Sequence, residues 1–196
     1  MSDNKWYTNK LVEKLPVGTE SLYVKDSIRT VSGKYVNVFD TDPDTISIED
    51  IAHALAHQPR FGGHLSEFYS VAQHSFLCYV NVNGDSAVKF SALMHDASEA
   101  YLLDMPKPIK INMPQYNDVE DKLMKVISNK FGFEYPKPKE VEDIDRWMLE
   151  REWTVLMLKN QSLVYDSIRC MSPDEAKKFF LEAFYNVKDS CGKVEG

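Results

Sequence analysis

Apolar residues recur at helical spacing through most of the chain after residue 48. A first short amphipathic helix carries Ile51, Ala54 and Leu55 on one face and stops before Pro59. The same period predicts further helices over about 66–80, 86–101, 115–131 and 138–158. The last helix is predicted to begin at Ser172, with Pro173 in its first position and Glu175 closing a capping box.

The segment before these helices has a different pattern. Residues 28–39 form two runs of β-branched and aromatic residues around Ser32-Gly33, which predicts a short β-hairpin. A two-stranded ribbon is marginally stable alone, so we expect it to lie on the helices. The fold class is therefore all-α, a helical bundle with a short N-terminal β-hairpin. We expect one domain over residues 1–196, with a core at about 28–188 and a disordered tail at 189–196.

Composition is that of an ordinary globular protein, with 43% apolar and 27% charged residues among 196. No apolar run has the length of a membrane span, and the N-terminus lacks the apolar core of a signal peptide. The three cysteines, Cys78, Cys170 and Cys191, form no C-x-x-C pair, which favours reduced thiols. We therefore expect a cytoplasmic protein that does not associate with membranes, with Cys78 in the core.

The net charge of −7 argues against binding to a nucleic-acid polymer, because such binding draws on clustered Lys and Arg. It does not exclude a small phosphorylated substrate, which one or two local cations and a metal ion can hold. The charge therefore favours a small-molecule enzyme.

The densest group of chemically active residues lies at 94–104. His95 and Asp96 stand side by side after an apolar run, Glu99 follows one turn later, and Asp104 precedes a Pro-Lys-Pro turn. Ionisable side chains are rarely buried unless they are paired or bind a metal. The alternative interpretation is a polar helix end that faces water.

A second histidine, His74, shares a helical stripe with Val71 and Cys78. Alone, this pattern is more typical of a hydrogen-bonded core histidine. The next helix runs antiparallel to this one, which brings His95 and Asp96 close to His74. A carboxylate from the helix at 138–158 would complete two imidazoles and two carboxylates, a set that suits zinc, cobalt, manganese or iron.

These residues resemble the H…HD…D motif of the HD-domain metal-dependent phosphohydrolases. The resemblance covers about residues 28–158, and its metal ligands correspond to His74, His95, Asp96 and Asp145. The motif alone is moderately specific, because the spacings between its parts vary. The segments around it look like the branch that acts on deoxynucleotides: Arg60-Phe61, Tyr69 to His74, Met94 to Tyr101, Asp104 and Pro106 to Lys110.

The resemblance implies a divalent cofactor (Zn²⁺, Co²⁺ or Mn²⁺, with Mg²⁺ an option at a second site) and a deoxynucleotide substrate. Glu99 and Asp104 are then the catalytic acid or base, within reach of a water molecule or the ester oxygen. The residues of the motif segments look more similar to those of the phage-type dATP triphosphohydrolases, which release deoxynucleoside and triphosphate. Gln73 stands where 5'-deoxynucleotidases tend to have an acid. A 5'-deoxynucleotidase remains the alternative, and a catalytically inactive nucleotide-binding HD protein is the second alternative.

Five further residues are candidates for substrate contacts. Arg60 offers a planar fork for phosphate oxygens. Phe61 could stack on the base or exclude water, and simple packing is the alternative. His64, in a glycine-containing loop, could touch substrate. Lys107 and Lys110 are phosphate candidates, although lysines in a Pro-rich turn are commonly only solvated.

Two competing interpretations concern the metal site. His53 and His57 share one helical face, but they lack the Glu that a zinc-peptidase helix needs and no third ligand is nearby. Asp143 is the rival of Asp145, and because it lies two positions away it points to a different side of the helix. We also expect a homo-oligomer, as the resemblance implies.

Overall fold

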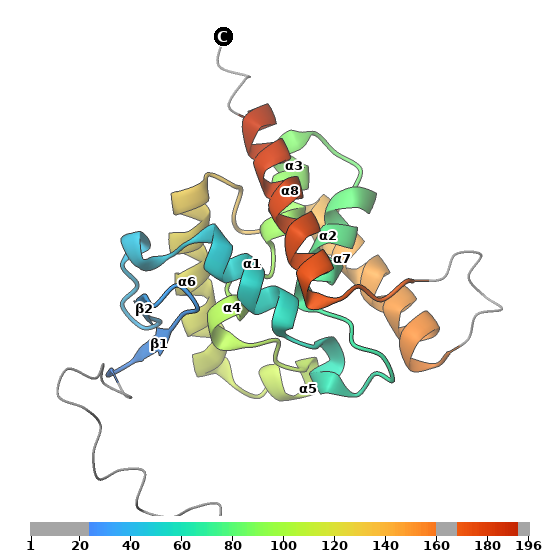
Figure 1. Cartoon of the computed structure of the whole chain (residues 1–196), viewed down its shortest axis with the longest axis horizontal. Coiled ribbons are helices and arrows are strands. Elements are labelled where there is room, and N and C mark those ends of the chain that lie inside the picture. Colours follow the sequence, from blue (N-terminus) through green and yellow to red (C-terminus); the bar gives the residue numbers. More distant parts are fainter. Residues whose placement is uncertain (1–23, 160–167, 192–196) are drawn as a thin grey trace, which may run out of the picture.

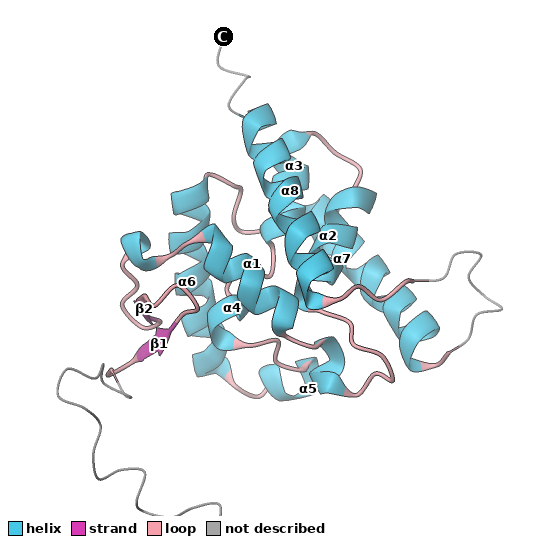
Figure 2. Cartoon of the chain, viewed as in Figure 1, coloured by secondary structure: helices cyan, strands magenta, loops and turns pink. Residues whose placement is uncertain are grey.

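The computed structural model describes residues 24–159 and 168–191 (Figure 1). Strands β1 (Ser27–Arg29) and β2 (Tyr35–Asn37) pair in antiparallel register and form a hairpin at one end. Most of the rest is helical (Figure 2). The all-α class with a short N-terminal hairpin is thereby confirmed for the described residues.

The hairpin is fixed to the start of helix α1 (Ile48–His57). The Asp50 carboxylate accepts hydrogen bonds from the Ser32 backbone N–H at 3.0 Å and from its hydroxyl at 2.7 Å. Val36, from β2, is fully buried in the main core. The ribbon therefore lies on the helices, as its marginal stability requires.

The other helices follow in an order close to the predicted one. Their bounds are α2 (Val71–Asn81), α3 (Ser86–Met94), α4 (Glu99–Leu102), α5 (Lys107–Lys110), α6 (Pro114–Phe131), α7 (Lys139–Glu152) and α8 (Pro173–Cys191). Shorter turns lie at η2 (Pro43–Thr45), η3 (Arg60–Gly63) and the π-helical η4 (Trp153–Met157).

Helix α8 closes the bundle by packing on α1, α2 and α3 (Figure 1). Its Phe180 and Phe184 are fully buried, and the Phe184 ring meets Phe90 of α3 edge-on. On the other side, α2 and α3 pack together and both contact α7. This arrangement brings the inner face of α2, the end of α3 and the middle of α7 to one place.

Two predicted helices are wrong at their ends. The helix predicted over 66–80 begins at Val71, because the Ser70 hydroxyl accepts from the Gln73 N–H at 3.2 Å and caps it. The helix predicted over 86–101 ends at Met94. The chain turns at 95–98 and resumes as α4, so His95 and Asp96 lie in a turn.

Two further predictions need correction. The Pro-Lys-Pro segment, predicted to be a turn, contains the short helix α5. The tail predicted to be disordered from residue 189 is wrong for 189–191, because α8 continues to Cys191. Residues 192–196 and the N-terminal segment 1–23, on which the signal-peptide prediction rests, lie outside the described residues.

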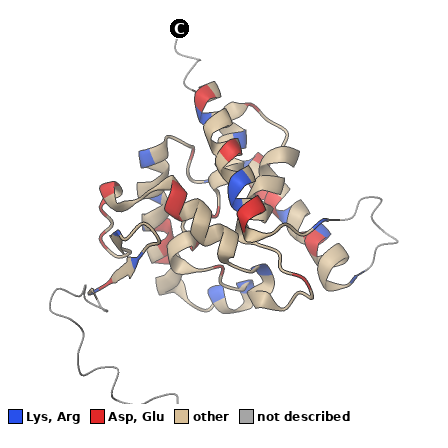
Figure 3. Cartoon of the chain, viewed as in Figure 1, with Lys and Arg blue, Asp and Glu red and all other residues tan. Residues whose placement is uncertain are grey.

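The described helices include none that is both long and apolar enough to cross a membrane. Basic and acidic residues both occur along the outer helix α8 (Figure 3).

Candidate metal centre

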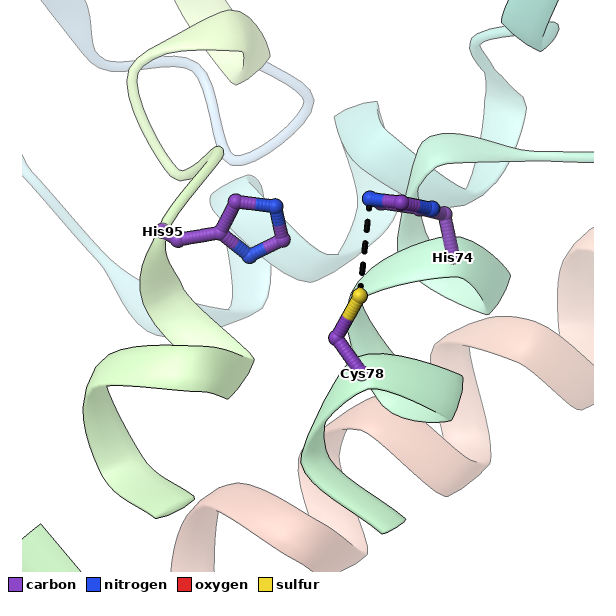
Figure 4. A group of neighbouring side chains, drawn as sticks. All are labelled: His74, Cys78 and His95. Carbon is purple, nitrogen blue, oxygen red and sulfur yellow. Dashed lines mark hydrogen bonds between the residues drawn. The ribbon is translucent and has the colours of Figure 1, made fainter. Parts of the chain in front are cut away.

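Two imidazole rings face each other where α2 meets the end of α3. His74 comes from α2 and His95 from the turn after α3, with ring centroids 5.3 Å apart. Figure 4 shows His95 approaching from one side and His74 with Cys78 from the other. Both histidine side chains are completely buried.

Each imidazole is held through its Nδ1 atom. His74 Nδ1 donates to Glu152 Oε1 at 2.6 Å, and His95 Nδ1 donates to the Ala92 carbonyl at 2.8 Å. A carboxylate and a carbonyl only accept, so Nδ1 carries a proton in both rings and Nε2 faces the space between them. Within the described part of the chain, the buried His95 Nε2 has no hydrogen-bond partner.

Two carboxylates reach the same space. Asp96 Oδ2 lies 3.2 Å from His95 Nε2 and 3.8 Å from His74 Nε2. Asp145 Oδ1, from α7, lies 3.2 Å from His74 Nε2 and 3.6 Å from His95 Nε2. The structure thus brings together the four side chains that the motif indicated, whereas Asp143 is exposed and pairs with Lys139.

The spacing of these four atoms suits one divalent cation. Ligand atoms at about 2.0–2.1 Å from a tetrahedral zinc ion lie about 3.3 Å from one another. The four nitrogen–oxygen distances here run from 3.2 to 3.8 Å. A set of two imidazoles and two carboxylates fits zinc, cobalt or manganese.

The charges of the cluster favour a cation in the same place. Burial opposes the charged form of His95, but the carboxylates of Asp96 and Asp145 outweigh it and raise the pKa of His95 to about 10. Burial likewise opposes ionisation of Asp145, yet His95 and His74 hold its pKa well below the usual range. Since imidazole binds metals in its neutral form, a metal ion and the imidazole protons compete for this position.

Glu152 supports the centre from behind, and sequence reasoning did not identify it. Its carboxylate is completely buried and accepts from Tyr69 Oη at 2.6 Å and from Arg60 Nε at 3.1 Å, in addition to His74. It lies seven residues after Asp145 on α7, two helical turns along the same face. That spacing is the signal in the sequence that could have found it.

Arg60 is placed between two carboxylates. Its Nε donates to Glu152, and its Nη1 lies 3.7 Å from Asp96 Oδ2. The side chain is only 9% exposed. The guanidinium therefore lies between Glu152, which orients His74, and Asp96, whose carboxylate faces the centre.

Lys137 also reaches the centre without having been identified from the sequence. Its Nζ donates to Asp145 Oδ2 at 2.8 Å, while Asp145 Oδ1 faces the imidazoles. One oxygen of the Asp145 carboxylate therefore binds the Lys137 ammonium group, and the other faces the space between the imidazoles.

The two predicted catalytic acids follow His95 and Asp96 in the chain: Glu99 is the first residue of α4, and Asp104 lies just after the turn that ends α4. Glu99 is buried, and its Oε2 has no hydrogen-bond partner among the described residues. Burial, followed by the charges of Asp96 and Asp104, raises the pKa of Glu99 well above its ordinary value. Burial also raises the pKa of Asp104. Both carboxyl groups therefore retain protons at higher pH than exposed ones do.

The backbone of the segment 99–104 is held at two points. Gln58 donates from Nε2 to the Glu99 carbonyl at 2.9 Å, and its Oε1 accepts from the Asp104 N–H at 3.2 Å. Leu103 adopts φ 71° and ψ 151°, a region that residues with a Cβ rarely occupy, and Tyr116 Oη donates to its carbonyl at 2.7 Å. The turn is therefore kept in a strained shape that sets the position of Asp104.

The predicted substrate residues divide into two groups. Phe61 lies beside the centre, with its ring centroid 5.8 Å from the Arg60 guanidinium and 6.2 Å from the ring of Trp153. Lys110 donates to Glu120 at 2.6 Å and lies close enough to lower the pKa of Glu99. His64 and Lys107 are exposed, and no contact in the described structure links them to the centre.

The competing pair His53 and His57 lies on α1 with ring centroids 4.1 Å apart. His57 Nδ1 bonds to the His53 carbonyl at 2.8 Å, and the His57 side chain is exposed. Among the described residues, no carboxylate forms an ion pair with either of these rings, in contrast to the centre.

Comparison with known proteins identifies relatives of the chain, although no family model matches it. The chain is 38% identical over 173 residues to the uncharacterized protein YfdR of Escherichia coli, an alignment that covers 83% of the chain and 96% of YfdR. It is 36% identical over 112 residues to the uncharacterized protein RCAP_rcc00048 of Rhodobacter capsulatus. That alignment covers 53% of the chain and 57% of the relative.

Proposed function

The chain belongs to the family of Escherichia coli YfdR, and we propose that it is a metal-dependent phosphohydrolase of 2'-deoxynucleotides. One observation carries the proposal. Two buried imidazoles, each fixed through Nδ1, turn their Nε2 atoms toward the Asp96 and Asp145 carboxylates. Burying so many ionisable groups is costly, and this set has the donor atoms and spacing of a divalent metal site.

His74, His95, Asp96 and Asp145 would hold the metal ion. When bound, a divalent cation lowers the pKa of water toward neutrality and offsets negative charge on a phosphoryl group. Glu152 and the Ala92 carbonyl keep the two rings in the tautomer that this requires.

Glu99 is the proposed proton donor or acceptor. Its buried position raises its pKa and so favours the protonated carboxyl group, and its Oε2 is not engaged by another described residue. Such a group can protonate the ester oxygen of the leaving deoxynucleoside. Asp104, held next to it by Gln58, is the second candidate for this proton transfer.

The choice of deoxynucleotides depends on the resemblance of the motif segments to that branch of the HD-domain phosphohydrolases. Cationic side chains around the centre, from Arg60, Lys110 and Lys137, suit an anionic phosphate chain. Phe61 and Trp153 present neighbouring aromatic rings, and Trp153 is 47% exposed. The leading substrate is dATP, cleaved to deoxynucleoside and triphosphate.

The test is to incubate the purified protein with each dNTP and dNMP in the presence of Co²⁺, Mn²⁺ or Zn²⁺. Triphosphate as product supports the triphosphohydrolase, whereas orthophosphate from a dNMP supports the alternative 5'-deoxynucleotidase. An Asp145→Ala variant serves as the control for contaminating activity. If the wild-type protein binds metal but hydrolyses no nucleotide, the proposed function is wrong and nucleotide binding without catalysis is the remaining alternative.

A further inference from the structure

Cys78 lies at the metal centre, where the motif assigns no cysteine. It follows His74 by one turn on α2, and its side chain is fully buried. Its Sγ atom is 3.6 Å from His74 Nε2, on the side that faces His95 (Figure 4). The Sγ atom and the Nε2 atoms of His74 and His95 all lie within 4.8 Å of one another.

A second observation points to a ligand in the same space. The His95 side chain is completely buried, and in the described ranges 24–159 and 168–191 its Nε2 makes no hydrogen bond, although the carboxylates of Asp96 and Asp145 lie 3.2 and 3.6 Å away. A buried polar atom without a partner is costly unless a ligand satisfies it. This atom and the Cys78 sulfur border the same space between the two helices.

The distances are those of a sulfur ligand beside a nitrogen ligand. Cys78 would be a fifth protein ligand, and with metal–nitrogen and metal–sulfur bonds of about 2.05 and 2.3 Å, neighbouring ligands of a five-coordinate centre lie about 3.1–3.6 Å apart. The Sγ–Nε2 distance here is 3.6 Å. A His and a Cys four residues apart on one helix also lie on the same face, as a shared metal requires.

The surrounding charges can accommodate a third anionic ligand. A thiolate added to Asp96 and Asp145 would give three negative ligands around a divalent ion. Arg60 Nη1 lies 3.7 Å from Asp96, and Lys137 Nζ lies 2.8 Å from Asp145. These two cations offset the additional negative charge.

We propose that Cys78 is an additional ligand of this metal centre and that its sulfur gives the site a preference for Zn²⁺ or Co²⁺ over Mn²⁺ and Mg²⁺. On binding, the thiol S–H bond breaks, the proton leaves to solvent and a sulfur–metal bond forms. Soft thiolate ligands favour such ions, whereas carboxylates and water suit manganese and magnesium. The inference depends on the metal centre of the proposed function.

The test uses the full-length protein loaded with Co²⁺, because a thiolate bound to cobalt gives a charge-transfer band in the near ultraviolet. We expect this band in the wild type and its loss in Cys78→Ser. Cys170→Ser and Cys191→Ser are the matched controls and should keep it. In competition with Mn²⁺, Cys78→Ser should lose at least about tenfold of the wild-type preference for Zn²⁺.

Folding is controlled with a variant that leaves Cys78 intact. The double variant Cys170→Ser/Cys191→Ser retains Cys78 as the single thiol of the chain, so a band in this protein must come from Cys78. One bound cobalt per chain without the band, or a band that survives Cys78→Ser, overturns the proposed sulfur ligand and leaves the phosphohydrolase intact. A wild-type protein that binds no cobalt contradicts both.

Discussion

The two sides of the centre are built in different ways. One side, called the helical side below, is formed by α2, α7 and the C-terminal end of α3. There His74 and His95 have their Nδ1 atoms bound, and Lys137 fixes one oxygen of Asp145. On the other side is the segment 99–104, which consists of α4 and the residues that end it and is called the turn below. Its backbone is held by hydrogen bonds, but Glu99 Oε2 is left without a hydrogen-bond partner in the described structure. On the helical side, hydrogen bonds hold the side chains of the proposed metal ligands. In the segment 99–104, hydrogen bonds hold the main chain.

This difference matches two tasks. A metal ligand must keep one orientation, so its remaining polar atoms are bound. A group that transfers a proton needs an uncommitted oxygen and a raised pKa, while its position is set through the main chain. Substitutions on the helical side should therefore change metal affinity, whereas those on the turn should change turnover at unchanged metal affinity.

The largest effect is expected for Asp145→Ala on the helical side. Loss of this carboxylate should reduce bound metal from one ion per chain to a small fraction. Turnover should fall by at least about 10³-fold, since metal catalysis contributes several kcal/mol. Elemental analysis and product assays measure both, with Asp143→Ala as the exposed control on the same helix. Equal losses in the two variants would contradict the assignment.

Glu99→Gln tests the turn. It removes the transferable proton but keeps the shape of the side chain, so turnover should fall by about 10²–10⁴-fold. Metal affinity, measured by titration with Zn²⁺, should stay within about twofold of the wild type, because Glu99 is not proposed to bind the ion. A variant that loses metal together with activity would remove the distinction between the two sides.

Glu152→Gln weakens the support of His74 without removing a ligand. Metal affinity should drop by about 10–100-fold, since a neutral amide holds the imidazole less firmly and leaves the buried Arg60 without a full counter-charge. Zinc titration measures this loss. Glu150→Gln, at an exposed position of the same helix, should bind metal like the wild type.

Gln58→Ala should loosen the turn from the outside. The loss of both hydrogen bonds to the turn is expected to lower turnover by about tenfold, because misplaced catalytic groups react more slowly. Metal affinity should not change, since the two hydrogen bonds of the Gln58 side chain go to the backbone at Glu99 and Asp104 and not to a metal ligand. Steady-state rates and a zinc titration of Gln58→Ala test this: turnover should fall while metal affinity stays that of the wild type.

The smallest effect is expected at Asp50, away from the centre. Burial opposes its ionisation, but hydrogen bonds from Ser32, Thr30 and Ser47 outweigh it and lower the pKa. A carboxyl group with a lowered pKa in the folded state stabilises the fold above its ordinary pKa and loses that contribution as the pH falls. Asp50→Asn should cost about 1–2 kcal/mol near neutral pH. Its urea-unfolding free energy should decline less steeply in acid, with metal affinity unchanged.

The meeting of the two histidines was predicted because helical period places them on apolar faces of two consecutive helices, which pack together across a short antiparallel connection. His74 shares its face with Val71 and Cys78, which are fully buried. The turn at 95–98 was missed because buried residues continue through it, at Ala97 and Tyr101. Periodicity therefore gave no sign that α3 ends at Met94.

The supporting residues were harder to identify. Glu152 lies 78 residues from His74, and α7 reads as a charged surface helix with few apolar positions. The seven-residue spacing of Glu152 from Asp145 was a signal, but the charged pattern of α7 gave no sign that this position is buried. Lys137 was not identified from the sequence either, although its Nζ donates a hydrogen bond to Asp145.

The most direct measurement is anomalous diffraction at the cobalt edge from crystals of the protein grown with Co²⁺. A single strong peak is expected between the Nε2 atoms of His74 and His95, within bonding distance of Asp96 and Asp145. A peak at His53 and His57 instead, or no peak at a protein that diffracts well, would contradict the metal centre and the hydrolysis proposed from it.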